Sequence, residues 1–182
     1  MRRIALLGLS GVGKSTMLGA LATQLTFTHL EASRLIRAEQ ARRSLAPQSS
    51  EALRIGSVLD NQALLIAGFE HEAALTDLPI IFDGHSVIDG REDLIEIPAE
   101  VFAALGLDAI CFLRAEPSDI LARRQNDTAR LRPARTVEAL GEHQEQAIAV
   151  AMTIADRLDC PFSLITNEDS AILVAYVAGE TP

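Results

Sequence analysis

Short apolar runs alternate along the chain with longer segments in which apolar residues recur every three or four positions. This alternation is typical of an α/β domain, in which helices cover a parallel sheet. The apolar runs predict five strands, and the periodic segments predict helices between them. The predicted strands are Ile4–Leu7, Thr26–Leu30, Pro79–Phe82, Asp108–Leu113 and Phe162–Ile165. The predicted helices are Ser15–Leu25, Ala32–Arg43, Glu51–Ala74, Pro98–Leu105, Pro117–Asn126, a long helix capped by Thr136, and Ser170–Ala178.

Two segments, 46–50 and 84–97, lack either pattern and are expected to be loops. The first helix and the long helix have apolar residues on one face, which we expect to be buried. At 182 residues the chain has the length of one domain, so residues 1–182 are expected to form a five-stranded parallel sheet flanked by helices. The apolar faces comprise Met17, Leu18, Leu21 and Leu25 in the first helix, and Val137, Leu140, Ile148, Ala151, Ile154 and Leu158 in the long one.

The segment Gly8–Ser15, with the sequence GLSGVGKS, fits the Walker A pattern and lies between a predicted strand and a predicted helix, as that motif requires. Its glycines let the backbone curl until N–H groups face phosphate oxygens, and the helix N-terminus adds a positive dipole end. Lys14 is expected to reach the β- and γ-phosphates of ATP, and the Ser15 hydroxyl to bind Mg²⁺. The predicted ATP-binding residues of this phosphate loop are Gly8, Gly11, Val12, Gly13, Lys14, Ser15 and Thr16.

A second metal ligand is predicted at Asp83, which directly follows the apolar run Ile80–Phe82. A carboxylate at the end of a strand suits a Walker B role beside the magnesium ion. Aspartates after strands also form turns, but the presence of a phosphate loop favours the metal role. We therefore predict that Ser15 and Asp83 bind the metal.

The motif Asp83-Gly84-His85 resembles the Asp-x-His Walker B variant of archaeal-type adenylate kinases and of the broad-specificity nuclear adenylate kinases. The resemblance continues through Phe112–Pro117 into Arg123–Arg132, which is similar to the short arginine-rich lid of the archaeal enzymes. It runs from the phosphate loop to about Arg132 and identifies a P-loop nucleoside monophosphate kinase family. It implies transfer of the γ-phosphoryl group of ATP to a nucleotide, with Mg²⁺.

The arginines of this stretch suit such a reaction. Transfer between two nucleotides brings many negative charges together, and planar guanidinium groups bind phosphates with two parallel hydrogen bonds. Residues 127–135 are expected to form the lid, with Arg124 and Arg135 as secondary candidates. A solvated basic helix end is the alternative interpretation. The predicted catalytic residues are Lys14, Arg123, Arg130 and Arg132.

Residues 30–75 are expected to bind the acceptor. The segment Ala32–Arg37 resembles the Thr-Gly-Asp-x-Leu-Arg segment of nucleoside monophosphate kinases, in which the arginine meets the acceptor phosphate. The chain departs from that pattern, since Arg34 replaces the aspartate and no Thr-Gly precedes it. It also lacks the Gly-Phe-Pro-Arg segment of bacterial adenylate kinases, which leaves the acceptor base open. The predicted acceptor residues are Arg37, Arg54, Gln62 and His85, of which Arg54 and Gln62 would equally suit an exposed surface.

Two predicted site residues keep a structural alternative. The resemblance puts His85 near the magnesium ion or the acceptor, but a histidine after a strand is also often a structural hydrogen-bonding group. No general base is needed when the acceptor is already a phosphate oxygen, so His85 is assigned no proton transfer. Asn167 follows the last predicted strand, where related kinases close over adenine, and it equally suits a helix-initiating turn.

Composition narrows the choice of partners and compartment. The formal net charge of −9 argues against a nucleic-acid partner, because the field of the protein would repel phosphates outside a local arginine cluster. Cys111 and Cys160 form no CxxC pattern, so we expect reduced thiols and a cytoplasmic protein. The apolar stretch near the N-terminus is too short for a signal peptide or a membrane span.

Two other functions stay open at this point. A small-metabolite kinase of the shikimate or gluconate type would share the phosphate loop but phosphorylate a hydroxyl group. It would then need a general base, for which Glu31 or an acid within Asp89–Glu96 is available. An ATP-dependent switch or assembly factor would instead use ATP turnover to control a partner protein. The sequence leaves the acceptor and the oligomeric state undetermined.

Overall fold

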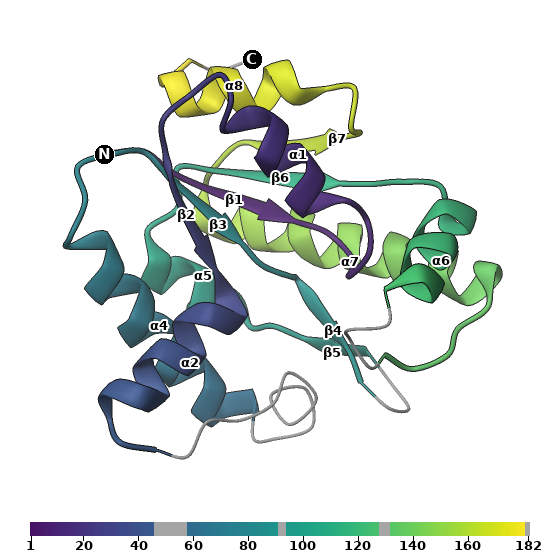
Figure 1. Cartoon of the computed structure of the whole chain (residues 1–182), viewed down its shortest axis with the longest axis horizontal. Helices are drawn as coiled ribbons and strands as arrows, with labels where there is room; N and C mark the ends of the chain where they lie inside the picture. Colours follow the sequence, from purple (N-terminus) through teal and green to yellow (C-terminus); the bar gives the residue numbers. More distant parts are fainter. Residues whose placement is uncertain (46–57, 91–93, 128–131, 181–182) are drawn as a thin grey trace.

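The computed structural model describes residues 1–45, 58–90, 94–127 and 132–180 and contains a five-stranded sheet between helices (Figure 1). The strand order is β2-β3-β1-β6-β7, and every neighbouring pair is parallel. The predicted five-stranded parallel sheet is therefore confirmed. The strands are β1 (Arg3–Leu7), β2 (Thr28–Glu31), β3 (Ile80–Asp83), β6 (Ala109–Leu113) and β7 (Phe162–Ile165).

The central strand β1 explains the continuous apolar run near the N-terminus. Residues 4–7 are fully buried, as expected for a strand covered on both faces. β1 pairs with β3 on one side and β6 on the other. The strands that follow β1 in sequence therefore lie on both sides of it, β2 and β3 on one side and β6 and β7 on the other. Such a change of side is a topological switch point, and open α/β sheets bind ligands there, outside the carboxyl ends of the strands.

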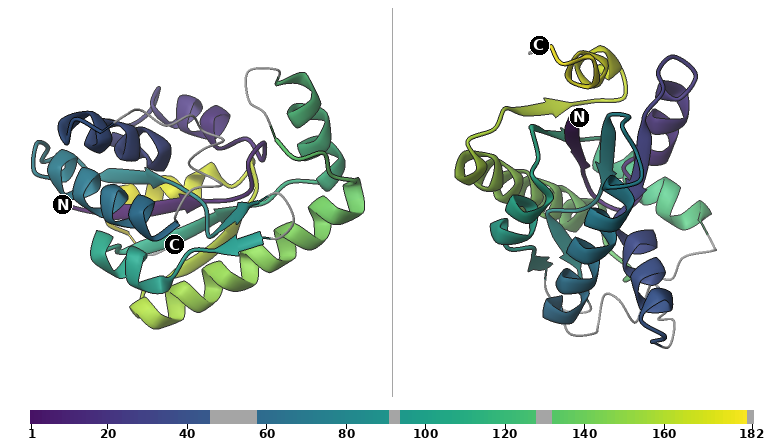
Figure 2. Two further views of the ribbon diagram at one scale, coloured as in Figure 1. Left: turned by 90° about the horizontal axis from the view of Figure 1, so that it is seen from below. Right: turned by 90° about the vertical axis from the view of Figure 1, so that its left-hand side faces the viewer.

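Helices cover both faces of the sheet. α1 and α8 lie on one face and α5 and α7 on the other, while α2 and α4 pack together on the β2 side (Figures 1 and 2). α6 follows β6 and contacts α7. The helices are α1 (Lys14–Leu21), α2 (Ala32–Arg42), α4 (Val58–Ala73), α5 (Ala99–Leu105), α6 (Pro117–Asn126), α7 (Val137–Leu158) and α8 (Ser170–Ala178).

The prediction that residues 84–97 form a loop is wrong. This segment contains an antiparallel hairpin of β4 (Val87–Asp89) and β5 (Leu94–Glu96). Each strand has three residues, which is too short for a recognisable alternation of apolar and polar positions. Contacts from outside the segment hold the hairpin, because the Ser86 hydroxyl donates to the Ala147 carbonyl of α7 at 2.7 Å.

The helix predictions are confirmed in kind, with differences at their ends. α1 ends at Leu21, so Leu25 lies beyond the helix and is only partly buried. Thr136 caps α7, since its hydroxyl oxygen accepts the N–H of Ala139 at 3.2 Å. Burial of Val137 was wrongly predicted, because it occupies the exposed first turn of α7. The predicted loop 46–50 and the start of the helix expected from Glu51 lie outside the described residues.

Within the described ranges, no helix combines the length and the apolar character that a membrane crossing requires.

Candidate active site

The phosphate loop connects β1 to α1 at the switch point of the sheet. Gly11 and Gly13 have φ angles of +91° and +113°, a region that other L-residues rarely adopt. An added Cβ on Gly8 would lie 2.7 Å from the Leu113 carbonyl oxygen, so only glycine fits where the loop passes this close to the end of β6. The glycine spacing noted in the sequence is therefore used for backbone conformation and packing.

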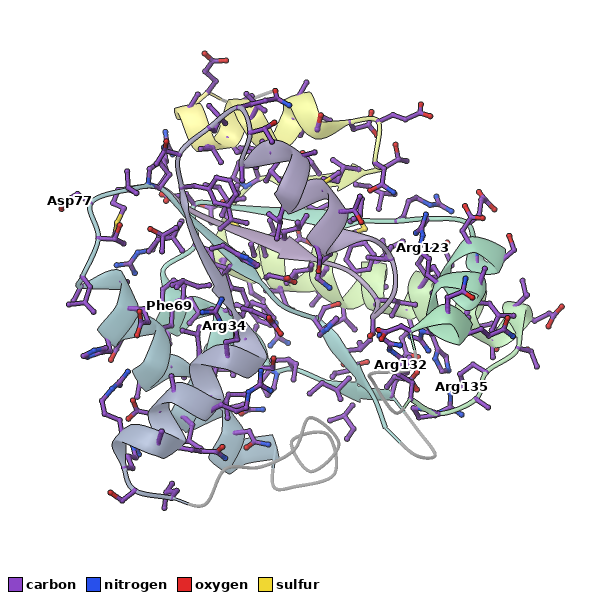
Figure 3. All side chains as sticks on the ribbon, in the orientation of Figure 1. Arg34, Phe69, Asp77, Arg123, Arg132 and Arg135 are labelled. Carbon is purple, nitrogen blue, oxygen red and sulfur yellow. The ribbon has the colours of Figure 1, made fainter. Side chains whose placement is uncertain are left out.

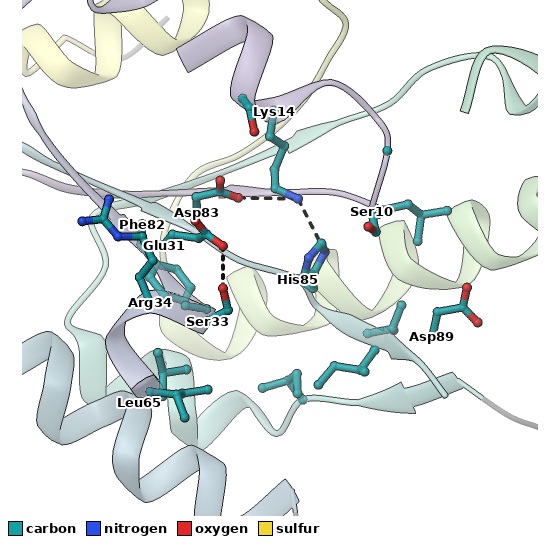
Figure 4. Close-up of a pocket in the computed structure, with 18 of the residues that line it drawn as sticks. Ser10, Lys14, Glu31, Ser33, Arg34, Leu65, Phe82, Asp83, His85 and Asp89 are labelled. Carbon is teal, nitrogen blue, oxygen red and sulfur yellow. Dashed lines mark hydrogen bonds and ion pairs between the residues drawn. The ribbon is translucent and has the colours of Figure 1, made fainter. Parts of the chain in front are cut away.

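Lys14 and Asp83 meet at the carboxyl edge of the sheet (Figure 4). The Lys14 Nζ atom lies 3.5 Å from Asp83 Oδ1, and the side chains are only 7% and 10% exposed. His29 Nε2 lies 3.4 Å from the other carboxylate oxygen. Burial would raise the pKa of Asp83, but the hydrogen bond from His29 and the charges of Lys14 and the nearby histidines outweigh it and lower the pKa. Asp83 is thus ionised in the folded protein.

His85 braces the start of the phosphate loop. Its Nδ1 atom lies 2.5 Å from the carbonyl oxygen of Gly8 and 3.5 Å from Lys14 Nζ. A carbonyl oxygen only accepts, so we assign the proton to Nδ1, which donates to Gly8. Lys14 donates to the same carbonyl oxygen at 3.1 Å. Because Nδ1 carries a proton, it has no lone pair with which to accept a hydrogen bond from Lys14. His85 and Lys14 share one acceptor.

Arginines from α6 and from the segment after it hold the phosphate loop by its oxygen atoms. Arg123 donates to the Val12 carbonyl at 2.7 Å, and Arg124 Nε donates to the Ser10 carbonyl at 2.8 Å. Arg132 Nε donates to the Ser10 hydroxyl at 3.0 Å. These bonds brace the loop without using its N–H donors. The structure thus brings the predicted residues Arg123 and Arg132 to the loop, together with the secondary candidate Arg124.

One guanidinium nitrogen of Arg132 is buried and finds no hydrogen-bond partner in the described part of the chain. Its side chain is 7% exposed and lines the cleft beside the loop, with one ion pair to Asp127 at 2.5 Å. Its second terminal nitrogen is buried without a hydrogen-bond partner among the described residues. A buried donor of this kind is costly unless a ligand satisfies it. The predicted catalytic residue Arg130 lies outside the described residues.

Asp89, at the end of β4, binds two further arginines. Arg124 donates to one carboxylate oxygen at 2.9 Å, and Arg135 donates to the other at 3.0 Å and 3.2 Å. His143 Nδ1 lies 4.0 Å from Asp89. The sequence placed Asp89 only within a range of possible general bases. Its partners lie 35 and 46 residues away, and no local pattern connects them.

Two predicted acceptor residues, Arg37 and Gln62, line the cleft on the side of α2 and α4, across from these arginines. Arg37, on α2, donates to Ser33 at 3.2 Å, and the Ser33 hydroxyl donates to the carboxylate of Glu31 at 2.5 Å. Arg34 stands on the same helix, while Figure 3 shows Arg123, Arg132 and Arg135 on the α6 side. The remaining candidates are Gln62, which lines the cleft from α4, and Arg54, which lies outside the described residues.

One cleft of about 920 Å³ joins these groups. Its floor holds the phosphate loop and Asp83, and its far end lies between α2 and α4 (Figure 4). Polar groups line the loop end, and apolar side chains line much of the far end. The far-end residues are Arg34, Arg37, Asn61 and Gln62, with Ile36, Leu65, Val101 and Phe102 among the apolar ones.

The predicted metal residues fit a magnesium ion. Ser15 and Asp83 line the same cleft, and a hydroxyl and a carboxylate oxygen are ligands that Mg²⁺ uses together with phosphate oxygens and water. The described residues contain no group of three or more His, Cys, Asp and Glu side chains that would hold a metal. Two protein oxygen atoms would fill only part of the coordination shell of Mg²⁺.

Asn167 lies beside the loop, since an added Cβ on Gly13 would be 3.4 Å from its amide nitrogen. The following helix α8 begins after Asp169 as its N-cap residue, and no side-chain hydrogen bond caps it. The Asp169 carboxylate accepts instead from the N–H and the hydroxyl of Thr166, each at 2.8 Å. The Asn167 side chain is thus placed next to the predicted nucleotide site.

A family model described as an AAA domain matches residues 7–141, which include the loop, Asp83 and the arginine segment. The chain belongs to this AAA-domain family. Among relatives of this AAA-domain protein, the adenylate kinase of Pyrococcus horikoshii is 27% identical over 169 residues, covering 91% of this chain and 86% of the relative. The adenylate kinase of Methanoculleus marisnigri is 24% identical over 174 residues, covering 92% and 91%. The predicted resemblance to archaeal-type adenylate kinases is confirmed.

Solved structures share the fold of this AAA-domain protein. A shikimate kinase from Bacteroides thetaiotaomicron superimposes with a TM-score of 0.58 at 18% identity and covers 98% of both chains. A gluconokinase from Sinorhizobium meliloti has a TM-score of 0.53 at 15% identity and covers 98% of this chain and 92% of its own. Together with the relatives above, the family match confirms the prediction of a P-loop phosphotransferase.

Proposed function

We propose that this protein is an ATP- and Mg²⁺-dependent nucleoside monophosphate kinase of the adenylate kinase type, which transfers the γ-phosphoryl group of ATP to a nucleotide. The cleft beside the phosphate loop carries this proposal, because it has the loop at one end and a partly apolar, arginine-bearing wall at the other. Two nucleotides meeting in it would place their phosphates between Lys14 and the arginines. The free thiols of Cys111 and Cys160 suit a reducing, cytoplasmic setting.

The donor half has the parts that ATP requires. Residues 8–16 would hold the triphosphate, with Lys14 on the β- and γ-phosphates and Asn167 beside the nucleotide. Ser15 and Asp83 would hold Mg²⁺, which when bound neutralises charge on these phosphates. The low pKa of Asp83 supports this role, since its carboxylate stays ionised for the metal even with burial working against it.

Arg132 supports the proposed lid, residues 127–135. The guanidinium nitrogen that no described residue satisfies belongs to a side chain lining a cleft expected to hold phosphates, and a phosphate oxygen would satisfy it. Arginines placed where charge develops contribute most of the catalysis in phosphoryl transfer. Arg123, Arg130 and Arg132 are the proposed catalytic arginines, and closing this segment would exclude water from the reaction.

The acceptor half, residues 30–75, offers charge and apolar surface together. Arg37 would bind the acceptor phosphate, with Gln62, Arg54 and His85 as further contacts. The apolar side chains of Leu65, Val101 and Phe102 suit the faces of a planar base. A sugar or a small acid would leave this surface without a partner.

ADP formation tests the proposal. Wild-type protein with ATP and Mg²⁺ is assayed alone and then with AMP, CMP, UMP, GMP and dTMP, and Lys14→Ala controls for contaminating kinase. Strong stimulation by one monophosphate is expected, and no stimulation by any of them would refute the proposal. Arg37→Gln should raise the acceptor KM at least about tenfold, while Arg157→Gln, which removes an exposed charge on α7, should change nothing.

A hydroxyl acceptor is the second candidate, and Glu31 is the observation that favours it. Glu31 lines the cleft and lies directly opposite Asp83 in the pairing of β2 with β3. Asp89, the other base considered, is engaged by two arginines. Replacing the monophosphates with sugars, sugar acids and cyclic polyols in the same assay separates the two functions. The Glu31→Gln variant should lose activity only if the acceptor is a hydroxyl group.

A further inference from the structure

Arg124, which the sequence offered only as a secondary candidate, contacts the phosphate loop through both its guanidinium group and its aliphatic stem. Its Nε donates to the Ser10 carbonyl at 2.8 Å, and its stem packs on Gly11, where an added Cβ would lie 3.0 Å from Arg124 Cγ. Ser10 and Gly11 form the bend of the loop before Gly13. The conformation of the loop therefore depends on where the guanidinium of Arg124 is held.

Asp89 binds the guanidinium group of Arg124. The side chains of Arg124 and Asp89 are 6% and 10% exposed, and their ion pair is 2.9 Å long. Arg135, from the segment before α7, binds the other oxygen of the same carboxylate and also donates to the Gly90 carbonyl at 3.0 Å. Removal of this carboxylate would take a close charged partner from the guanidinium of Arg124, whose side chain is almost fully buried, and breaking a buried ion pair in this way is strongly unfavourable.

We propose that Asp89 is a positioning residue for ATP binding, which acts by holding Arg124 against Ser10 and Gly11 of the phosphate loop. It would not touch the nucleotide. The hairpin β4–β5 then has a role beyond forming a wall of the cleft, because its last residue on β4 fixes the geometry of the donor site. The inference rests on the proposed function only in taking ATP as the ligand of the loop.

Binding of ATP alone tests this, without any acceptor. The dissociation constant for ATP with Mg²⁺ is measured by calorimetry on the full chain, for wild type and for Asp89→Asn, which keeps the shape but removes the charge. The Kd is expected to rise roughly 10- to 100-fold, as for other misplaced binding groups. The matched control is Glu96→Gln on β5, which makes the same change on the same hairpin at an exposed position and should leave the Kd within about twofold.

A double-mutant cycle separates positioning from a general loss of structure. If Asp89 acts through Arg124, Asp89→Asn should weaken binding far less in the Arg124→Gln background than in the wild type. Multiplicative effects of the two changes would overturn the inference, and so would a Kd for Asp89→Asn that equals the wild-type value.

Arg124→Lys keeps the inference testable if Asp89→Asn fails to fold. A lysine ammonium keeps the charge but lacks the planar fork that spans Ser10 and Asp89, so the Kd should rise about tenfold with little change in unfolding temperature. An unchanged Kd in this variant would overturn the inference. Wild-type protein that fails to bind ATP would overturn the proposed function as well. If wild-type protein binds ATP and the variants respond as expected, but no nucleoside monophosphate is phosphorylated, the role of Asp89 is supported and the proposed acceptor is refuted.

Discussion

The ammonium nitrogen of Lys14 and a carboxylate oxygen of Asp83 lie 3.5 Å apart, although 68 residues separate them in the sequence. The phosphate loop contributes one and β3 the other, and the parallel pairing of β1 with β3 places them together. This pair puts one positive and one negative charge where a nucleotide phosphate and its metal ion would arrive.

The ionisation of Asp83 predicts acid sensitivity. Its folded pKa is lowered below the ordinary value of 3.8, so the stability it contributes is complete above that value and is lost as the pH falls through the folded pKa. The unfolding free energy, measured with urea at several pH values below about 5, should fall more steeply for wild type than for Asp83→Asn. Parallel pH profiles would contradict this account of the carboxylate.

Gly11 and Gly19 form a matched pair of glycines in the same region. Gly11 has a φ of +91° and its added Cβ would meet Arg124, whereas nothing lies within 4 Å of an added Cβ on Gly19, in α1. Gly11→Ala should weaken ATP binding at least about tenfold, through backbone strain of about 1–2 kcal/mol and a displaced arginine. Gly19→Ala should raise the unfolding free energy by about 0.5–1 kcal/mol and leave the Kd unchanged.

The contact between α2 and α4 predicts a selective effect on the acceptor half. An added Cβ on Gly68 would lie 2.8 Å from the Leu35 carbonyl oxygen, so Gly68→Ala should force the two helices apart and cost about 1–3 kcal/mol of stability. The acceptor KM should rise while the Kd for ATP stays the same. In Gly141→Ala, the new methyl group makes only an ordinary 3.5 Å contact with Pro117, and both constants should match wild type.

The two cysteines should differ in reactivity. Burial raises the pKa of the Cys111 thiol to about 12, and burial followed by the charges of Asp108 and Asp159 raises that of the half-buried Cys160 thiol. Thiol reagents attack the thiolate, so native protein at neutral pH should be labelled slowly at Cys160 and hardly at all at Cys111. Mass spectrometry locates the label, and both residues should react in denaturant. Rapid labelling of Cys111 in native protein would contradict its burial.

The parts of the molecule that the sequence predicted are those encoded in neighbouring residues. Buried parallel strands appear as aliphatic runs such as residues 4–7, and the phosphate loop is a local motif whose glycines have local conformational reasons. The hairpin of Val87–Asp89 with Leu94–Glu96 was missed because three-residue strands carry too little pattern and depend on α7 for support. The association of Asp89 with Arg124 and Arg135 was missed for a related reason, since only the folded chain brings these residues together.

The close packing of Gly68 in α4 against the backbone of Leu35 in α2 also constrains how the molecule can change shape. At this close approach no side chain can rotate to let α2 and α4 slide, so we expect the two helices to move as one body. Within the described chain, this body joins the sheet at the junction of Glu31 with Ala32 and through residues 74–79. Opening or closing of the acceptor side would then be a hinge rotation about those two connections. A pair of fluorophores on α2 and α4 should report a constant separation, while a pair joining α2 to α8 should report the motion.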